Sequence, residues 1–293
     1  MELKKLGVWV AMDNFAAADA AAFAKRVEAW GYGALWMPEA VGRETLAAAG
    51  FLLAHTTKLT IATGIANIYA RDAQAAAAGQ NTLAELSGGR FLLGLGVSHV
   101  PIVEGLRQHS YGKPVESMRA YLKAMAAAPY MAPPPKTKPK TVIAALGPKM
   151  LELAAERADG AHPYNVPPEH TAEARKILGP GKLLCVEQAV ILETDPAKAR
   201  AAARQFLAPY IGLPNYYNNW TRLGFTDADR ESGGSDRLID AVIAWGDEKA
   251  LRARLDAHWK AGADHVCIQP IGKFTGNLPA PDEKLLALLA PGS

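Results

Sequence analysis

Residues 59–99 read LTIATGIANIYARDAQAAAAGQNTLAELSGGRFLLGLGVSH, and this stretch decides the fold. The apolar runs at 59–65 and 90–96 have the length and composition of buried β-strands. Between them, alanine and leucine at helical spacing predict a helix over 72–86, which the glycines at 88 and 89 end. A strand, a helix and a second strand in this order predict a βαβ unit with parallel strands.

The same unit recurs along the chain, because a helix end, a glycine and a short apolar run also follow one another at 28–37, 156–163 and 260–268. Eight such units predict a single (β/α)8 TIM barrel that spans residues 1–293 as one domain. A doubly wound open sheet is the alternative, but no G-x-G-x-x-G pattern follows the first strand. The expected strands are 6–11, 34–37, 59–65, 90–96, 141–145, 160–164, 183–192 and 265–269. The expected helices are 16–30, 44–56, 72–86, 114–128, 148–158, one after 168, 196–207, 247–260 and 281–289.

Two segments do not fit the repeat. Residues 129–140 are rich in proline and lysine and predict an extended connector. Residues 210–236, after the seventh strand, hold five aromatic side chains among glycine, proline and asparagine, and we expect an irregular insert there. Aromatic side chains of this kind would either cover a bound substrate or pack in a homodimer interface.

Composition excludes several classes of protein. The hydrophobic fraction of 49% supports a large core, and two cysteines are too few for a disulfide scaffold. A net charge of +3 is too small to indicate a nucleic-acid partner. The chain has no run of 18 apolar residues and its first residues make a poor signal peptide, so we expect no membrane partner and a cytoplasmic location. Histidine and acidic spacings typical of metal sites are missing, so no metal is expected.

Several motifs in sequence order resemble the bacterial luciferase-like monooxygenase superfamily. They are T-G-I-x-N at 63–67, L-S-G-G-R at 86–90, L-G-L-G at 93–96, W-M-P-E at 36–39 and ALGPKMLELAAERADGAHPYN at 145–165. The resemblance covers at least residues 5–195 and 245–272. G-V-S-H at 96–99, Y-G-K-P at 111–114 and A-L-G-P-K at 145–149 are similar to the branch that uses the deazaflavin F420. The resemblance implies a barrel that binds F420, or alternatively FMN, at the C-terminal ends of its strands.

The loop between the fifth strand and its helix is a candidate phosphate site. Pro148 suits the first helical position, and the amides of Lys149 and Met150 are expected to be free there. Free amides at a helix start bind anions, and the Lys149 side chain would add charge. The alternative is an ordinary βα turn without a ligand.

The turn after the third strand is a second candidate, where the resemblance implies a non-proline cis peptide between Gly64 and Asn67. Glycine at 96 would admit a flat ring, and Ser98 and His99 would donate hydrogen bonds to it. Capping of a helix by Ser98 and an αL turn at Asn67 are the structural alternatives. The candidate cofactor contacts are Gly64, Ile65, Ala66, Asn67, Gly96, Ser98, His99, Leu146, Gly147, Pro148, Lys149, Met150 and His162.

Glu39 and His99 are the candidate catalytic residues. Glu39 follows the second strand, where an apolar surrounding would suit it to acid/base chemistry. A salt bridge to Arg43 or Arg71 is the alternative. The better-known deazaflavin dehydrogenases of the family place a histidine after this acid, whereas this chain has Ala40. That difference weakens any mechanism that depends on such a histidine.

The function that these observations favour is F420-dependent hydride transfer to or from a small organic substrate. The first alternative is an FMN-dependent monooxygenase. The second is a barrel that binds a flavin without catalysis or has only a structural role. A Schiff-base aldolase barrel is disfavoured, because no expected strand ends on a lysine.

Overall fold

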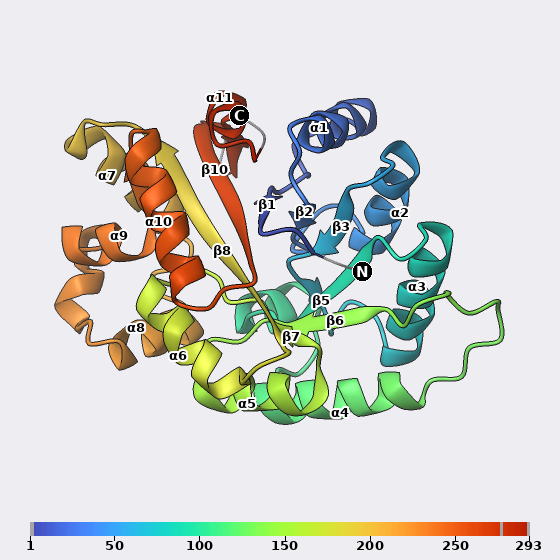
Figure 1. The fold of residues 1–293 in the computed structure, drawn as a ribbon. Coiled ribbons are helices and arrows are strands. Elements are labelled where there is room, and N and C mark those ends of the chain that lie inside the picture. Colours follow the sequence, from blue (N-terminus) through green and yellow to red (C-terminus); the bar gives the residue numbers. More distant parts are fainter. Residues whose placement is uncertain (1–2, 276–277, 292–293) are drawn as a thin grey trace.

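Eight parallel strands form a closed ring in the computed structural model, which describes residues 3–275 and 278–291 (Figure 1). Each strand pairs with the next along the chain, and the last pairs with both the first and the seventh. The predicted (β/α)8 barrel is therefore confirmed. The barrel strands are β1 (Leu6–Trp9), β2 (Ala34–Met37), β3 (Thr60–Thr63), β5 (Phe91–Gly96), β6 (Lys140–Ile143), β7 (Gly160–Ala161), β8 (Leu183–Leu192) and β10 (His265–Thr275).

The strands are apolar throughout because both of their faces are covered. Every residue of β1, β2, β3 and β5 is buried, as parallel strands between a filled barrel and an outer ring of helices require. At Gly160 the neighbouring strand comes so close that a Cβ atom would lie 1.9 Å from the carbonyl oxygen of Leu183. Glycine at this position therefore permits the pairing of β7 with β8.

Helices between the strands cover the outside of the ring (Figure 1). Five of them begin where an acidic side chain accepts a hydrogen bond from a free amide of the first turn, at Glu44, Asp72, Asp195, Asp247 and Asp282. Several others begin with proline at the first helical position, as the sequence predicts. The covering helices are α1 (Ala17–Ala29), α2 (Thr45–His55), α3 (Ala73–Leu86), α4 (Pro114–Ala127), α5 (Pro148–Arg157), α6 (Pro168–Leu178), α7 (Pro196–Leu207), α10 (Glu248–Lys260) and α11 (Glu283–Leu288).

The prediction that residues 210–236 are irregular is wrong. They contain α8 (Pro214–Arg222) and η2 (Asp227–Gly233), and α9 (Asp236–Val242) begins at their end. Tyr216 and Trp220 lie one turn apart and are both buried, so α8 is held by its packing rather than by helix propensity. The short elements β4 (Ala66–Asn67), η1 (Pro101–Leu106), β9 (Ala244–Gly246) and β11 (Leu278–Pro281) were also not expected.

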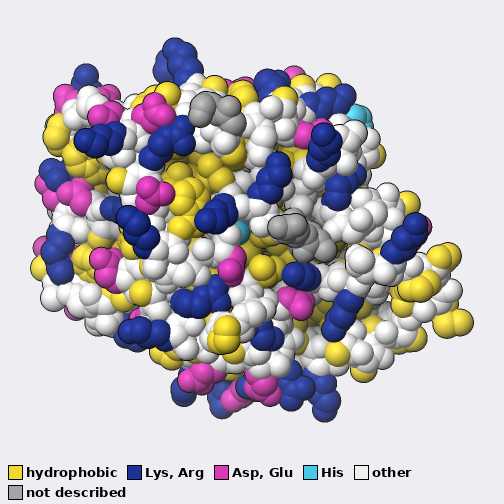
Figure 2. Space-filling model, in the orientation of Figure 1, with side chains coloured by type: hydrophobic (Ala, Val, Ile, Leu, Met, Phe, Trp, Pro, Cys, Tyr) yellow, Lys and Arg dark blue, Asp and Glu magenta, His cyan; other side chains and the backbone are white. Residues whose placement is uncertain are grey.

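Residues 129–139 are irregular, as predicted, and project from the barrel between α4 and β6 (Figure 1), whereas Lys140, expected in this connector, is the first residue of β6. Hydrophobic side chains gather on this projection (Figure 2), where Met131 is 96% exposed. The rest of the visible face carries basic and acidic side chains that are interspersed (Figure 2). None of the helices within 3–275 and 278–291 combines the length and apolar character needed to cross a bilayer.

Candidate functional site

The turn after β3 packs against the end of β1 and against the residues that follow β7. A cis peptide joins Gly64 to Ile65, which confirms the predicted cis bond in this turn. The indole Nε1 of Trp9 donates to the carbonyl oxygen of Gly64 at 3.0 Å. A Cβ atom on Gly64 would lie 2.6 Å from that Nε1 and 3.0 Å from Nε2 of His162. Only glycine therefore leaves room for these two rings at the turn.

The residues after the cis bond pair with the end of β5. Ala66 and Asn67 are buried in β4, and Asn67 pairs with Gly96. A Cβ atom on Gly96 would lie 2.5 Å from the Ile65 side chain, so this glycine seats Ile65. The Asn67 Oδ1 accepts from the Tyr69 amide at 2.9 Å, but its buried Nδ2 has no acceptor among the described residues. A buried amide donor without an acceptor is a candidate ligand contact.

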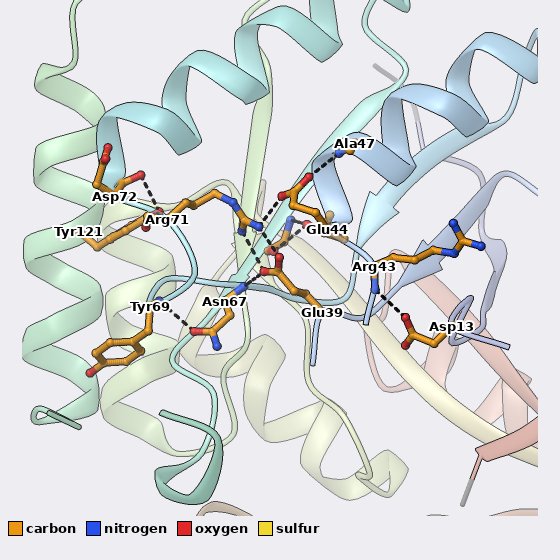
Figure 3. Close-up of polar contacts among 12 residues, drawn as sticks. Asp13, Glu39, Arg43, Glu44, Ala47, Asn67, Tyr69, Arg71, Asp72 and Tyr121 are labelled. Carbon is orange, nitrogen blue, oxygen red and sulfur yellow. Dashed lines mark hydrogen bonds and ion pairs between the residues drawn. The ribbon is translucent and has the colours of Figure 1, made fainter. Parts of the chain in front are cut away.

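Glu39 lies beside this turn in an ionic network (Figure 3). Its Oε2 accepts from the Asn67 amide at 2.7 Å and from Arg71 Nη1 at 2.9 Å, while its Oε1 accepts from Arg71 Nη2. Arg71 Nη2 also donates to Glu44 at 2.6 Å. The apolar surrounding expected for Glu39 is therefore wrong, and of the two predicted salt-bridge partners the structure selects Arg71. Glu39 therefore joins the Asn67 backbone to the Arg71 side chain.

Ser98 and His99 follow β5 at the barrel mouth. Ser98 has a φ of 56°, and its carbonyl oxygen accepts from the Tyr111 hydroxyl at 3.1 Å. Burial lowers the pKa of His99, and a hydrogen bond with the Asn215 side chain opposes that shift. His99 also contacts the ring of Tyr216, with a centroid separation of 5.8 Å. The imidazole is therefore neutral near pH 7 and lies against the insert.

The Leu146–Met150 loop differs from its prediction in one respect. The Met150 amide donates to the Gly147 carbonyl at 3.1 Å, so the expectation that it is free is wrong. The Met150 amide is therefore satisfied within the first turn of α5, whereas the Lys149 amide has no acceptor among the described residues. Pro148 is the first residue of α5, and a Cβ atom on Gly147 would meet nothing within 4 Å. The loop is thus open on the Gly147 side and offers one free amide beside the exposed Lys149 side chain.

His162 lies inside the barrel rather than at an open surface. Its Nδ1 is 2.8 Å from the Cys185 carbonyl, and its ring stacks on Trp36 at 4.5 Å. Burial lowers the pKa of His162 to about 4, and the bond to Cys185 opposes this, so the ring is neutral at pH 7. Since a carbonyl accepts, Nδ1 carries the proton and Nε2 presents a lone pair that no described residue satisfies. His265, expected to be structural, accepts from Trp36 Nε1 at 3.0 Å at the opposite end of the strands.

Glu187 was not predicted and is the most unusual side chain of the barrel. It is 1% exposed in the middle of β8, and its Oε2 accepts from the Asn165 amide at 3.1 Å. Burial raises the pKa of Glu187 to about 8, and the Asn165 bond opposes the rise. The proton therefore lies on Oε1, which has no partner among the described residues. An acid within an apolar strand is visible in the sequence, whereas Glu193 at the strand end only caps a local turn.

Aromatic side chains of the insert pack against Tyr164, which follows β7. The Tyr164 hydroxyl donates to Gln269 Oε1 at 2.8 Å and lies 3.1 Å from the Tyr210 hydroxyl. Tyr216 packs edge-on against Tyr210 at 5.3 Å. This packing agrees with the insert as a cover over the mouth. No group of three or more histidine, cysteine or acidic side chains in the described part of the chain could hold a metal ion.

Comparisons with known proteins agree with this geometry. The sequence model of the luciferase-like monooxygenase family matches residues 3–265. A Mycobacterium tuberculosis protein, assigned by name only as a coenzyme F420-dependent oxidoreductase, is 27% identical over 92% of this chain and 94% of its own length.

Two solved structures share the fold over nearly their whole length. The coenzyme F420-dependent tetrahydromethanopterin reductase from Methanopyrus kandleri has a TM-score of 0.77 at 18% identity, covering 99% of this chain and 98% of its own. A type II Baeyer–Villiger monooxygenase from Pseudomonas putida, in complex with FMN, has a TM-score of 0.71 at 13% identity, covering 98% and 97%. At these identities the likeness concerns the fold alone.

Proposed function

Because the chain belongs to the luciferase-like monooxygenase family, we propose that it is an oxidoreductase with a flavin-type cofactor, F420 in preference to FMN, and a small organic substrate. The names of the M. tuberculosis and M. kandleri proteins support F420, and the FMN-bound P. putida structure supports the alternative. One observation of this chain carries the proposal. The turn at 64–67 packs against Gly96 and presents the unpaired Asn67 Nδ2 at the end of the barrel strands.

The described residues fit a cofactor of this class. Gly64 and Gly96 let the Trp9, His162 and Ile65 side chains pack closely around the turn, and Asn67 Nδ2 would donate to a ring carbonyl. The free Lys149 amide and the Lys149 side chain would hold a phosphate group at the start of α5. When bound, a deazaflavin supplies hydride transfer, whereas FMN can also activate oxygen.

We propose two roles for the candidate catalytic residues. Glu39 and Arg71 would fix the Asn67 backbone, since the Glu39 carboxylate accepts from that amide. His99, neutral through burial, would donate or accept a hydrogen bond at the mouth. Ala40 leaves no histidine beside Glu39, so we propose no mechanism that depends on one.

Titration of the purified protein with F420 and with FMN, each oxidised and reduced, tests the proposal through cofactor fluorescence. We expect F420 to bind more tightly than FMN. The Asn67→Ala variant should bind F420 about fivefold to tenfold more weakly, since one hydrogen bond is worth about 1 kcal/mol. Tight binding of FMN alone would select the monooxygenase, and binding of neither cofactor would overturn the proposal.

We further propose that residues 1–293 form one barrel domain and that the protein is a cytoplasmic homodimer. The exposed hydrophobic side chains, such as Met131 on the projection, agree with a partner surface. Light scattering coupled to size exclusion should give twice the mass of one chain. A monomeric mass at micromolar concentration would contradict the dimer.

A further inference from the structure

A cleft of about 470 Å³ opens beside the Glu39 network. It is lined by three segments of the chain: residues 39–44 between β2 and α2, Ala70 and Arg71 after β4, and Leu106, Arg107 and His109 at the end of η1. The described part of the chain thus places the candidate acid Glu39 on the wall of an open cleft at the ends of the barrel strands.

The cations of this cleft are not equivalent. Arg71 is neutralised by Glu39 and Glu44. Arg43 donates to the carbonyl oxygens of Met12 and Phe15, and its guanidinium points away from Arg71 (Figure 3).

Arg107 differs from both of these side chains. Like Arg43, it has no carboxylate within ion-pair distance among the described residues, but unlike Arg43 its side chain donates no hydrogen bond to them, and its Nε is buried without an acceptor there. The Arg107 guanidinium is therefore the cation of this cleft that remains available to a ligand.

Apolar side chains surround the same cleft. Val41 and Leu106 line it and are 64% and 55% exposed, and Val100 just before η1 is 45% exposed. Large apolar side chains are seldom so exposed together unless something covers them. A ligand that covers Val41 and Leu106 while it binds Arg107 has an apolar body and an anionic group.

We propose that this cleft binds the substrate and that the substrate is an organic anion, a carboxylate or phosphate on an apolar body, held by Arg107. This inference rests on the proposed function for its meaning as a substrate site. Arginine suits the role because its planar guanidinium donates two parallel hydrogen bonds to a carboxylate or phosphate. Glu39 lines the same cleft, so a substrate held by Arg107 would lie beside the candidate acid.

Calorimetric titration with octanoate and with octanamide, with and without added F420, tests the inference. The two probes share their apolar chain and differ in charge. We expect octanoate to bind at least about tenfold more tightly, as one charge-assisted pair implies. Raising the salt concentration should weaken the binding of octanoate and leave the binding of octanamide unchanged. Equal binding of the two probes would overturn the inference.

Substitutions of Arg107 test whether this residue binds the anionic group. Arg107→Gln should weaken the binding of octanoate about tenfold and change the binding of octanamide by no more than about twofold. Arg107→Lys should retain part of the affinity for octanoate. Lys138→Gln removes the same charge from the exposed projection and should change neither. Unaltered octanoate binding in both Arg107 variants, with melting temperatures like the wild type, would overturn the assignment.

F420 and FMN titrations of the same variants separate the two proposals. Cofactor binding that survives in Arg107→Gln while octanoate is lost supports the cleft as the substrate site. Loss of cofactor binding with octanoate binding retained would assign Arg107 to the cofactor and overturn the substrate inference. Wild-type protein that binds octanoate through Arg107 but binds neither cofactor would overturn the proposed function and keep the anion site.

Discussion

Replacing Glu187 by glutamine should remove a pH-dependent loss of stability that the barrel carries. Burial raises the pKa of Glu187 to about 8 from an ordinary value of 4.5. Between these values the unfolded chain ionises this carboxyl and the folded chain does not, so stability falls as pH rises. Each unit of pH in this window costs about 1.4 kcal/mol. From pH 5 to pH 7 the loss is about 2.5 kcal/mol. Below pH 4.5 both states are protonated and the loss disappears.

Urea denaturation followed by tryptophan fluorescence measures the effect. The free energy of unfolding of Glu187→Gln minus that of the wild type should increase by about 2.5 kcal/mol from pH 5 to pH 7. All other titrating groups cancel in this difference. Glutamine keeps an acceptor for the Asn165 amide, so little else changes. Glu193→Gln, directly after the same strand, is the matched control for removal of a carboxylate. A difference for Glu187→Gln that is constant within about 0.5 kcal/mol would refute a protonated Glu187.

Three further substitutions test the site and the barrel. Glu39→Gln leaves the largely buried Arg71 with one carboxylate and should lower the free energy of unfolding by about 2 kcal/mol in urea titrations. Gly96→Ala would push its Cβ into Ile65 and should weaken F420 binding about tenfold in fluorescence titrations. Gly160→Ala meets a backbone oxygen at 1.9 Å and should cost about 3 kcal/mol, measured by thermal and urea unfolding.

Matched controls accompany these substitutions. Glu116→Gln removes an acid whose side chain is 71% exposed, and Gly212→Ala adds a methyl group that meets nothing within 4 Å. Both should change the free energy of unfolding by less than about 0.5 kcal/mol. If Glu39→Gln behaves like Glu116→Gln, the ionic network does not hold the turn. If Gly96→Ala behaves like Gly212→Ala, the packing of the Ile65 side chain against Gly96 does not affect cofactor binding.

The sequence predicts the barrel well because covered parallel strands are short apolar runs with clear ends. The bounds of β2, β8 and α7 agree with their predictions to the residue. By contrast, α8 contains three asparagines and follows a glycine, so its local sequence indicates a loop. What makes it a helix is a tertiary effect, the burial of Tyr216 and Trp220 in an apolar cluster with Phe206 and Leu207 of α7.

The site is predicted in part, for a similar reason. The positions of Glu39, Gly64 and His162 at strand ends follow from the repeat, and the structure places Gly64 next to His162 inside the barrel, with Glu39 beside the same turn. What each side chain bonds to depends on residues distant in sequence. The Arg71 that pairs with Glu39 stands 32 positions away, and the sequence alone offered Arg43 as an equal partner. The burial of Glu187 likewise depends on β7, β10 and the insert together.

The pairing of β1 with β10 also has a consequence for biosynthesis. Leu6 of β1 pairs with Val266 of β10, so the ring stays open until β10 has been translated. Until then β1 and β8 each present an unpaired edge, which invites intermolecular pairing. A long chain of this kind is prone to aggregate until its last barrel strand has been synthesised. Ribosome-bound chains that end before residue 265 should therefore remain sensitive to protease along β1, and longer ones should become resistant.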